Sequence, residues 1–194
     1  MYTEILIDDE LADTALFLAK KRIVFEYPRK GYGQYDEKNH LMNLQYGYLG
    51  ELAFLNLITR HFSDKYASVS PPERFVKLQD ENFKYNFVIG QTDGGFDFSI
   101  KGKEIDVKTY GTKLIKNIDE IKRYNLLIDM RQAQNHQADI YIQAFILGNR
   151  RPEKCIIAGY YEGLPPVNYN FPKPAHAVAI DKLKPVDQLL KEYF

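Results

Sequence analysis

Two aspartates and a lysine lie close together in residues 96–108, whose sequence is FDFSIKGKEIDVK. Side chains on a β-strand alternate between its two faces, so Asp106 and Lys108 share a face if this segment is extended. Carboxylate oxygens are ligands that suit Mg²⁺ or Mn²⁺, and an ammonium beside such an ion can orient a water or stabilise charge on a phosphate oxygen. These residue types at this spacing point to metal-assisted hydrolysis of a phosphodiester.

Asp97 joins this pair if the segment forms a β-hairpin. A turn at 101–102 pairs Asp97 with Asp106, whereas a turn at 102–103 pairs Asp97 with Lys108, and the sequence leaves both registers open. Either register puts the three polar side chains on one face. Either register also puts four apolar side chains on the other face, namely Phe96, Phe98, Ile105 and Val107. Opposed side chains have Cβ atoms about 4.5–5.5 Å apart, and two carboxylates at that distance repel unless a cation lies between them.

Glu51 is a candidate third carboxylate. It lies in residues 47–57, GYLGELAFLNL, at the margin of an apolar helical stripe. Gly47 and Gly50 each cost about 1 kcal/mol in a helix interior, a cost that is explained if the backbone must approach the hairpin closely. The alternatives are structural and not functional. Glu51 would lie on a helix surface, and Asp106 and Lys108 would form a solvated pair on an exposed strand.

The elements that must position these residues follow from the hydrophobic periodicity. Apolar spacing predicts helices at 8–25 and 41–62, with a loop at 27–39 between them and an irregular segment at 63–82. The later part of the chain predicts strands at 86–90, 96–110, 125–130, 138–147, 155–161 and 177–180, a loop at 162–174 and a closing helix at 186–193. We therefore expect a mixed α/β (α+β) fold, with a central mixed β-sheet flanked by helices, in a single domain spanning 1–194.

Composition narrows the classes of function. The formal net charge is zero, which argues mildly against binding nucleic acid through bulk charge but does not exclude DNA. The single cysteine, Cys155, cannot form an intrachain disulfide or a Cys-rich metal site, so a reducing cytoplasm fits best. The first ten residues do not resemble a signal peptide, and no apolar run approaches the roughly 18 residues of a bilayer span. We expect a soluble, cytoplasmic protein with no membrane partner.

The remaining chemistry-bearing residues give weaker signals. The sequence contains neither a Gly-x-Ser-x-Gly elbow nor a phosphate-binding glycine loop. The four histidines have no metal-ligand spacing and read as surface or interface residues: His40, His61, His136 and His176. Basic residues gather near 20–30, 113–123 and 150–154, where they would either follow a phosphate backbone or lie on solvated surfaces.

The hairpin segment resembles a known family. Asp97, followed by eight residues and then Asp106-Val107-Lys108, is similar to the core motif of the PD-(D/E)xK nuclease superfamily, which has the restriction-endonuclease-like fold. The segment with Glu51 resembles the upstream helical glutamate that completes the metal site in many members. The usual proline before the first aspartate is replaced by Phe96. The resemblance covers roughly residues 47–110 and implies a central mixed sheet flanked by helices and Mg²⁺-dependent cleavage of DNA.

The resemblance and the residue chemistry together predict roles for four residues. Asp97 and Asp106 hold Mg²⁺, with Mn²⁺ as a substitute, Glu51 holds or bridges to the ion, and Lys108 positions the attacking water. Cutting both strands of a duplex with one active site per chain requires a homodimer or a partner subunit. The family resemblance suggests a restriction-type or phage or mobile-element endonuclease. The rival hypotheses are a nucleic-acid-binding module that no longer cuts and a subunit of a larger restriction or transposition assembly.

Overall fold

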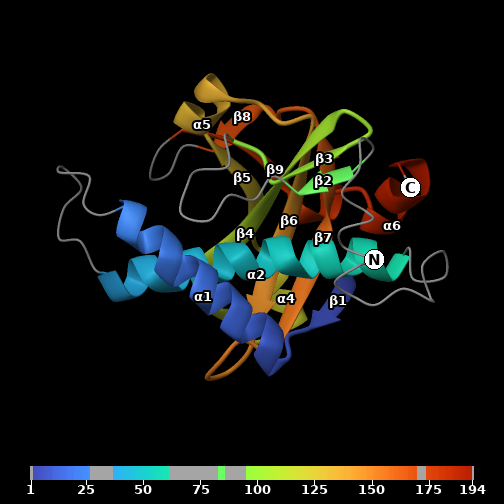
Figure 1. Cartoon of the computed structure of the whole chain (residues 1–194). Coiled ribbons are helices and arrows are strands. Elements are labelled where there is room, and N and C mark those ends of the chain that lie inside the picture. The colour runs from blue at the N-terminus through green and yellow to red at the C-terminus, as the bar shows by residue number, and fades with distance from the viewer. Residues whose placement is uncertain (1, 27–36, 62–82, 86–94, 170–173, 194) are drawn as a thin grey trace.

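The computed structural model describes residues 2–26, 37–61, 83–85, 95–169 and 174–193 (Figure 1). The expected strand at 86–90, the irregular segment at 63–82 and most of the expected loop at 27–39 lie outside these residues.

Two long helices come first along the chain. Helix α1 spans Asp9–Glu26, and the Asp8 carboxylate caps it by accepting a hydrogen bond from the Leu11 amide at 2.8 Å. Helix α2 spans Glu37–His61 and begins four residues before the expected start at 41, because residues 37–40 are polar and do not show in an apolar pattern. The later helices are short: α4 (Ile118–Ile121), α5 (Met130–Asn135), the 3-10 turn η1 (Ile180–Lys182) and α6 (Val186–Tyr193).

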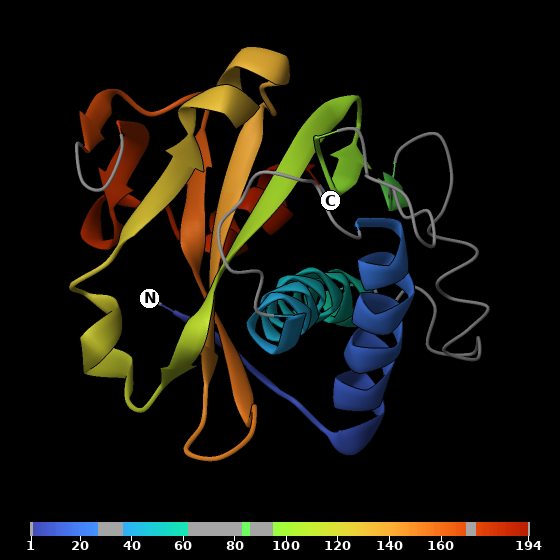
Figure 2. The same cartoon turned by 90° about the vertical axis from the view of Figure 1, so that its left-hand side faces the viewer.

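The central sheet has six strands in the order β1-β7-β6-β4-β3-β2. Strand β4 runs parallel to β6 and every other neighbouring pair is antiparallel, so the sheet is mixed. Its strands are β1 (Thr3–Leu6), β2 (Phe83–Tyr85), β3 (Phe98–Ile100), β4 (Lys103–Ile115), β6 (Ile140–Leu147) and β7 (Lys154–Glu162). Helix α2 lies across one face of this curled sheet with α1 beside it (Figures 1 and 2). The expected mixed α/β class, with a central mixed sheet flanked by helices, is confirmed.

A second, antiparallel sheet lies on the other side and has the order β5-β9-β8. It consists of β5 (Asn125–Asp129), β9 (Ala175–Ala179) and β8 (Val167–Tyr169). The strands expected at 125–130 and 177–180 thus belong to this sheet and not to the central one. Strand β8 falls inside the loop expected at 162–174, since a three-residue strand is too short to give an alternating pattern.

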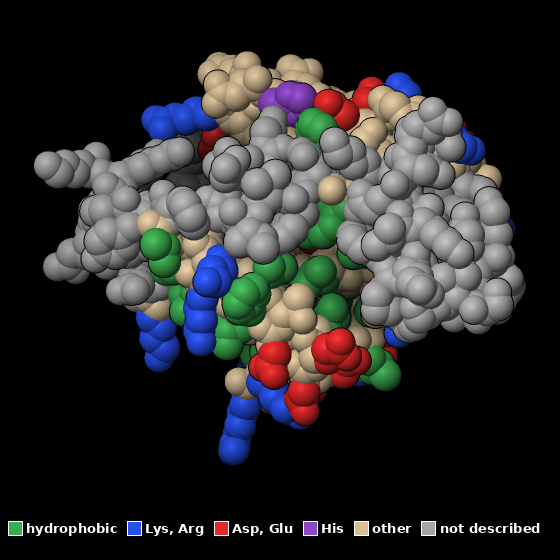
Figure 3. Space-filling model, viewed as in Figure 1, with side chains coloured by type: hydrophobic (Ala, Val, Ile, Leu, Met, Phe, Trp, Pro, Cys, Tyr) green, Lys and Arg blue, Asp and Glu red, His purple; other side chains and the backbone are tan. Residues whose placement is uncertain are grey.

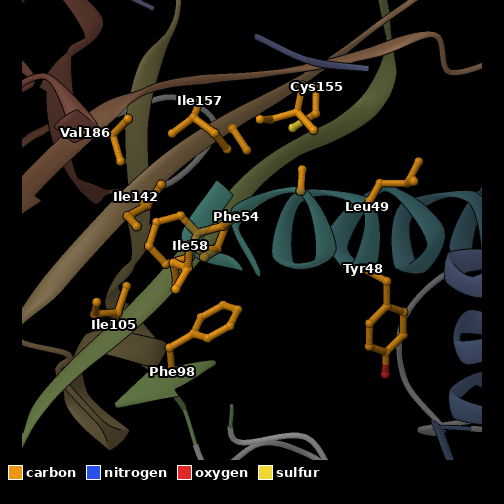
Figure 4. Close-up of a cluster of buried hydrophobic side chains, with 14 of the residues drawn as sticks. Tyr48, Leu49, Phe54, Ile58, Phe98, Ile105, Ile142, Cys155, Ile157 and Val186 are labelled. Atoms are coloured by element: carbon orange, nitrogen blue, oxygen red, sulfur yellow. The ribbon is translucent and has the colours of Figure 1, made fainter. Parts of the chain in front are cut away.

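The largest buried cluster lies between α2 and the central sheet. Figure 4 shows Phe54 and Ile58 of α2 facing Phe98, Ile105 and Ile142 of the strands. Cys155 belongs to the same cluster, and burial raises the pKa of its thiol to about 12, so the thiol stays protonated and unreactive at neutral pH. Smaller apolar clusters occupy the opposite face, where β5 and β9 pack over Tyr141. No helix in the described ranges is long and apolar enough to cross a membrane.

Candidate active site

The β3–β4 hairpin adopts the first of the two expected registers. Ile100 pairs with Lys103, and Lys101 and Gly102 form the turn with φ angles of 47° and 77°. Positive φ at both central residues matches the turn type whose twist suits a two-residue hairpin. The ladder ends where Phe98 pairs with Ile105, so Asp97 lies just before β3.

Asp97 is held by both residues that flank Asp106. Its amide donates to the Ile105 carbonyl at 2.8 Å, and its Oδ2 accepts a hydrogen bond from the Val107 amide at 2.7 Å. The side chain is almost buried, with 5% of the residue exposed. A buried carboxylate therefore lies just before β3, on the β4 backbone at either side of Asp106, in a position that these two contacts define.

Asp106 and Lys108 form a close ion pair on the same face of β4. The Lys108 Nζ lies 2.6 Å from Asp106 Oδ2, and Gln132 Nε2 donates to that same oxygen at 2.6 Å. Asp106 is 4% exposed, whereas the Lys108 side chain keeps 23% of its surface in solvent. A buried carboxylate is costly unless charged or polar partners compensate it, and here the lysine does so while still reaching solvent.

Helix α2 approaches β4 closely just before Glu51. A Cβ at Gly50 would overlap the Thr109 hydroxyl and lie 3.3 Å from Ala144 Cβ, so the expected reason for this glycine is confirmed. The same expectation is wrong for Gly47, because nothing lies within 4 Å of a Cβ placed there.

Glu51 is held at the margin of the site by a tyrosine. Its Oε2 accepts a hydrogen bond from the Tyr85 hydroxyl at 2.8 Å, and the Tyr85 ring stacks on Phe98 at 4.7 Å between centroids. Burial raises the pKa of Tyr85 far above its usual range, and the negative charges of Glu51 and Asp97 raise it further. Tyr85 therefore stays protonated and lies within the electrostatic reach of both carboxylates.

Of the four predicted site residues, the structure joins Asp106 and Lys108 in an ion pair and holds the Asp97 carboxylate on the backbone amide of Val107, the residue between them. Among the described residues, no three acidic, histidine or cysteine side chains gather closely enough to hold a metal ion. Glu51 therefore does not complete a three-carboxylate set with the two aspartates. Asp97 and Asp106 supply two carboxylates, and Mg²⁺ usually takes one or two from a protein and completes its shell with waters and phosphate oxygens.

Two glutamines of the site were not predicted. Gln143 of β6 is buried and donates to the backbone carbonyl of Lys108 at 2.8 Å, and its polarity within the apolar run YIQAFIL was a signal that sequence reasoning could have used. Gln132 comes from α5, six residues long and capped by the Asp129 carboxylate, which is too short to show helical periodicity.

Phe96 departs from the predicted face. Phe98, Ile105 and Val107 pack beneath α2 as expected, but Phe96 joins the cluster on the opposite side of the sheet and stacks on His136. The reason is local: β3 begins only at Phe98, after a backbone with φ of 109° at Gly95, so strand alternation does not extend back to Phe96.

Comparisons of the chain with models of known families, with curated proteins and with solved structures found no match. The likeness to PD-(D/E)xK nucleases therefore stays a prediction from the motif. A proposal for the function must therefore be based on the geometry of the hairpin and of the residues around it.

Proposed function

We propose that this protein is a Mg²⁺-dependent nuclease that hydrolyses DNA phosphodiester bonds, with Asp97, Asp106 and Lys108 at its centre. The observation that carries the proposal is the burial of two carboxylates, Asp106 on β4 and Asp97 on the β4 backbone amide of Val107, with a partly exposed lysine 2.6 Å from Asp106. An ordinary surface ion pair has no need of this burial, whereas a site that binds a cation beside a phosphate does.

The two aspartates would hold the ion. Two anionic groups in a water-poor site repel each other, and a divalent cation between them removes that repulsion. Bound Mg²⁺ would supply Lewis acidity toward a phosphate oxygen and a more acidic water. Asp97 keeps its place through the Val107 amide, so its carboxylate is oriented before any ion arrives.

Lys108 would act on the substrate. Its ammonium is next to Asp106 and remains in contact with solvent, so it can donate to an incoming phosphate oxygen or orient a water. Gln143 supports this role by holding the Lys108 carbonyl, which ties β4 to β6 at that residue. Glu51 would contribute by bridging to the ion from the margin of the site, in the orientation that the Tyr85 hydroxyl imposes.

The surface is compatible with DNA binding by local contacts. On the face in Figure 3, the described basic side chains are interspersed with acidic ones, in keeping with a net charge of zero. Affinity would then come from a few lysines and arginines near the site and from the bound ion. A restriction-type or phage or mobile-element role, a homodimer or partner subunit for double-strand cleavage, and a cytoplasmic location are parts of the same proposal.

Cleavage assays test the proposal directly. Plasmid and single-stranded DNA are incubated with the wild type in Mg²⁺, Mn²⁺, Ca²⁺ or EDTA, beside Asp97→Ala, Asp106→Asn and Lys108→Ala. We expect cleavage with Mg²⁺ and Mn²⁺ only, and a loss of at least about 100-fold in each variant. Mg²⁺-dependent activity that survives Asp97→Ala and Lys108→Ala would overturn the mechanism. DNA binding without any cleavage would indicate the non-cutting module instead, and activity only with added partner proteins would indicate a subunit of a larger assembly.

A further inference from the structure

His136 connects three parts of the molecule that meet at the candidate site. It follows α5 directly, and its amide caps that helix by donating to the Gln132 carbonyl at 2.9 Å. Its Nε2 lies 2.7 Å from an oxygen of Glu104 on β4, and its ring stacks on Phe96 with 5.6 Å between centroids. Helix, strand and the segment leading into Asp97 are thus joined through one side chain.

The spacing of α5 matches the spacing of β4. Gln132 and His136 are four positions apart, about one helical turn, and a turn rises about 5.4 Å. Glu104 and Asp106 are two positions apart on a strand, about 6.6–6.8 Å. Two parallel contacts result, from Gln132 to Asp106 and from His136 to Glu104. The second contact therefore fixes the angle at which α5 presents its glutamine to the buried carboxylate.

The segment before Asp97 is pressed against the histidine. A Cβ at Gly95 would lie 2.8 Å from His136 Cβ and 2.9 Å from its Cγ, and Gly95 has a φ of 109°. Only glycine fits both the backbone conformation and the space. Asp97 is thus held between the β4 backbone on one side and, through Gly95 and Phe96, the imidazole on the other.

We propose that His136 is a positioning residue that keeps Asp97 on the β4 backbone beside Asp106, and its effect on catalysis rests on the nuclease function proposed above. The alternative is that His136 and Glu104 form an ordinary surface pair with no positioning role. The two side chains are 31% and 33% exposed, and such a pair contributes only a little stability. The alternatives differ in one measurable contact, the hydrogen bond from the Val107 amide to Asp97 Oδ2.

The test compares His136→Ala with His136→Gln, which keeps a donor for Glu104, and with His176→Ala as the matched control. His176 is also partly buried and bonds a single acceptor, the Pro165 carbonyl, in the second sheet. Amide hydrogen exchange is followed by NMR at Val107 and, for reference, along β6 and β7. Asp97→Ala, which removes the acceptor, sets the size of a complete loss. Mn²⁺ affinity and the separate kcat and KM for DNA are measured on the same variants.

We expect His136→Ala to speed exchange at Val107 about tenfold or more while the reference amides change little, with partial recovery in His136→Gln and no change in His176→Ala. Mn²⁺ binding should weaken about tenfold to a hundredfold, and kcat should fall while KM for DNA stays near the wild-type value. Exchange that rises equally at all amides, or not at all, would overturn the positioning role. Local loss at Val107 in a protein whose wild type neither binds Mn²⁺ nor cuts DNA would support the positioning role and overturn the nuclease function.

Discussion

The two faces of β4 show how one strand serves both folding and chemistry. Toward α2 the strand presents Ile105 and Val107, which are buried in the main core. Toward α5 it presents Glu104, Asp106 and Lys108, each of which contacts a named polar partner. Asp106 is about as buried as Ile105 and Val107, while Glu104 and Lys108 keep part of their side chains in solvent, so the contrast is between apolar and polar packing around one buried strand.

A central strand covered on both faces usually reads as a nearly continuous apolar run. Strand β4 departs from that pattern, and the departure costs desolvation energy that its hydrogen bonds and ion pair offset. Apolar packing would stabilise the fold at least as well, so a functional role explains the polar face of β4 better than a stabilising one. Proteins break such rules mainly at functional sites.

The largest expected effect comes from removing a charge on the polar face of β4. Lys108→Met keeps the aliphatic stem but deletes the ammonium beside Asp106. We expect single-turnover cleavage with Mg²⁺ to fall about 10²–10³-fold, because a donor to the developing charge is lost. Lys182→Met, at an exposed lysine beside Asp181, is the matched control and should leave the rate unchanged. A drop smaller than about fivefold in Lys108→Met would remove the lysine from the mechanism.

The corresponding change on the apolar face should act on stability. Ile105→Ala deletes buried methylene groups under α2 and should lower the free energy of unfolding by about 2–5 kcal/mol. Urea denaturation measures it, with Leu127→Ala on the exposed face of β5 as the control, expected within about 0.5 kcal/mol of the wild type. Cleavage per folded molecule should stay within a few-fold of normal. If Ile105→Ala instead abolished activity in the folded protein, the division between the two faces would not hold.

The contact between α2 and β4 gives a third test. Gly50→Ala should cost about 2–3 kcal/mol, because the new Cβ would overlap the Thr109 hydroxyl and force helix and strand apart. Gly47→Ala is the matched control and should stabilise the protein by about 1 kcal/mol, since its Cβ enters open space on the same helix. Thermal unfolding of both variants checks the difference, and equal effects would show that the close approach carries no energetic weight.

The smallest expected effect concerns the margin of the site. Tyr85→Phe removes the hydroxyl that donates to Glu51 and should cost about 1.5 kcal/mol near neutral pH. Because the folded-state pKa of Tyr85 is raised, the unfolded chain loses this proton first, at about pH 10, and stability falls as pH rises beyond that value. Wild-type stability should therefore fall more steeply above pH 10 than that of Tyr85→Phe. Identical slopes in pH-dependent denaturation would show that Tyr85 ionises normally.

The features that sequence reasoning predicted correctly are those that local pattern controls. Alternation over residues 96–108 placed Asp106 and Lys108 on one face, and apolar spacing located α1, α2, β6 and β7 to within a few residues. The same reasoning failed at Phe96, where a glycine backbone ended the alternation, and it passed over the short elements β1, β2, α4, α5 and β8. An element of three to six residues contains too few positions to express a period of 2 or 3.6.

The sequence by itself thus determined which side chains of the hairpin could work together, because strand geometry ties neighbouring residues to fixed faces. Only the tertiary structure decided the hairpin register, the amide that holds Asp97, the hydroxyl that holds Glu51, and the approach of Gln132 and His136 from a short helix. The contacts of Glu51, Gln132 and His136 join residues about 26 to 34 positions apart. At that separation, the packing of whole helices and strands determines which side chains come into contact. Local propensity has no influence over that distance, so the partners of the buried carboxylates could not be read from the chain alone.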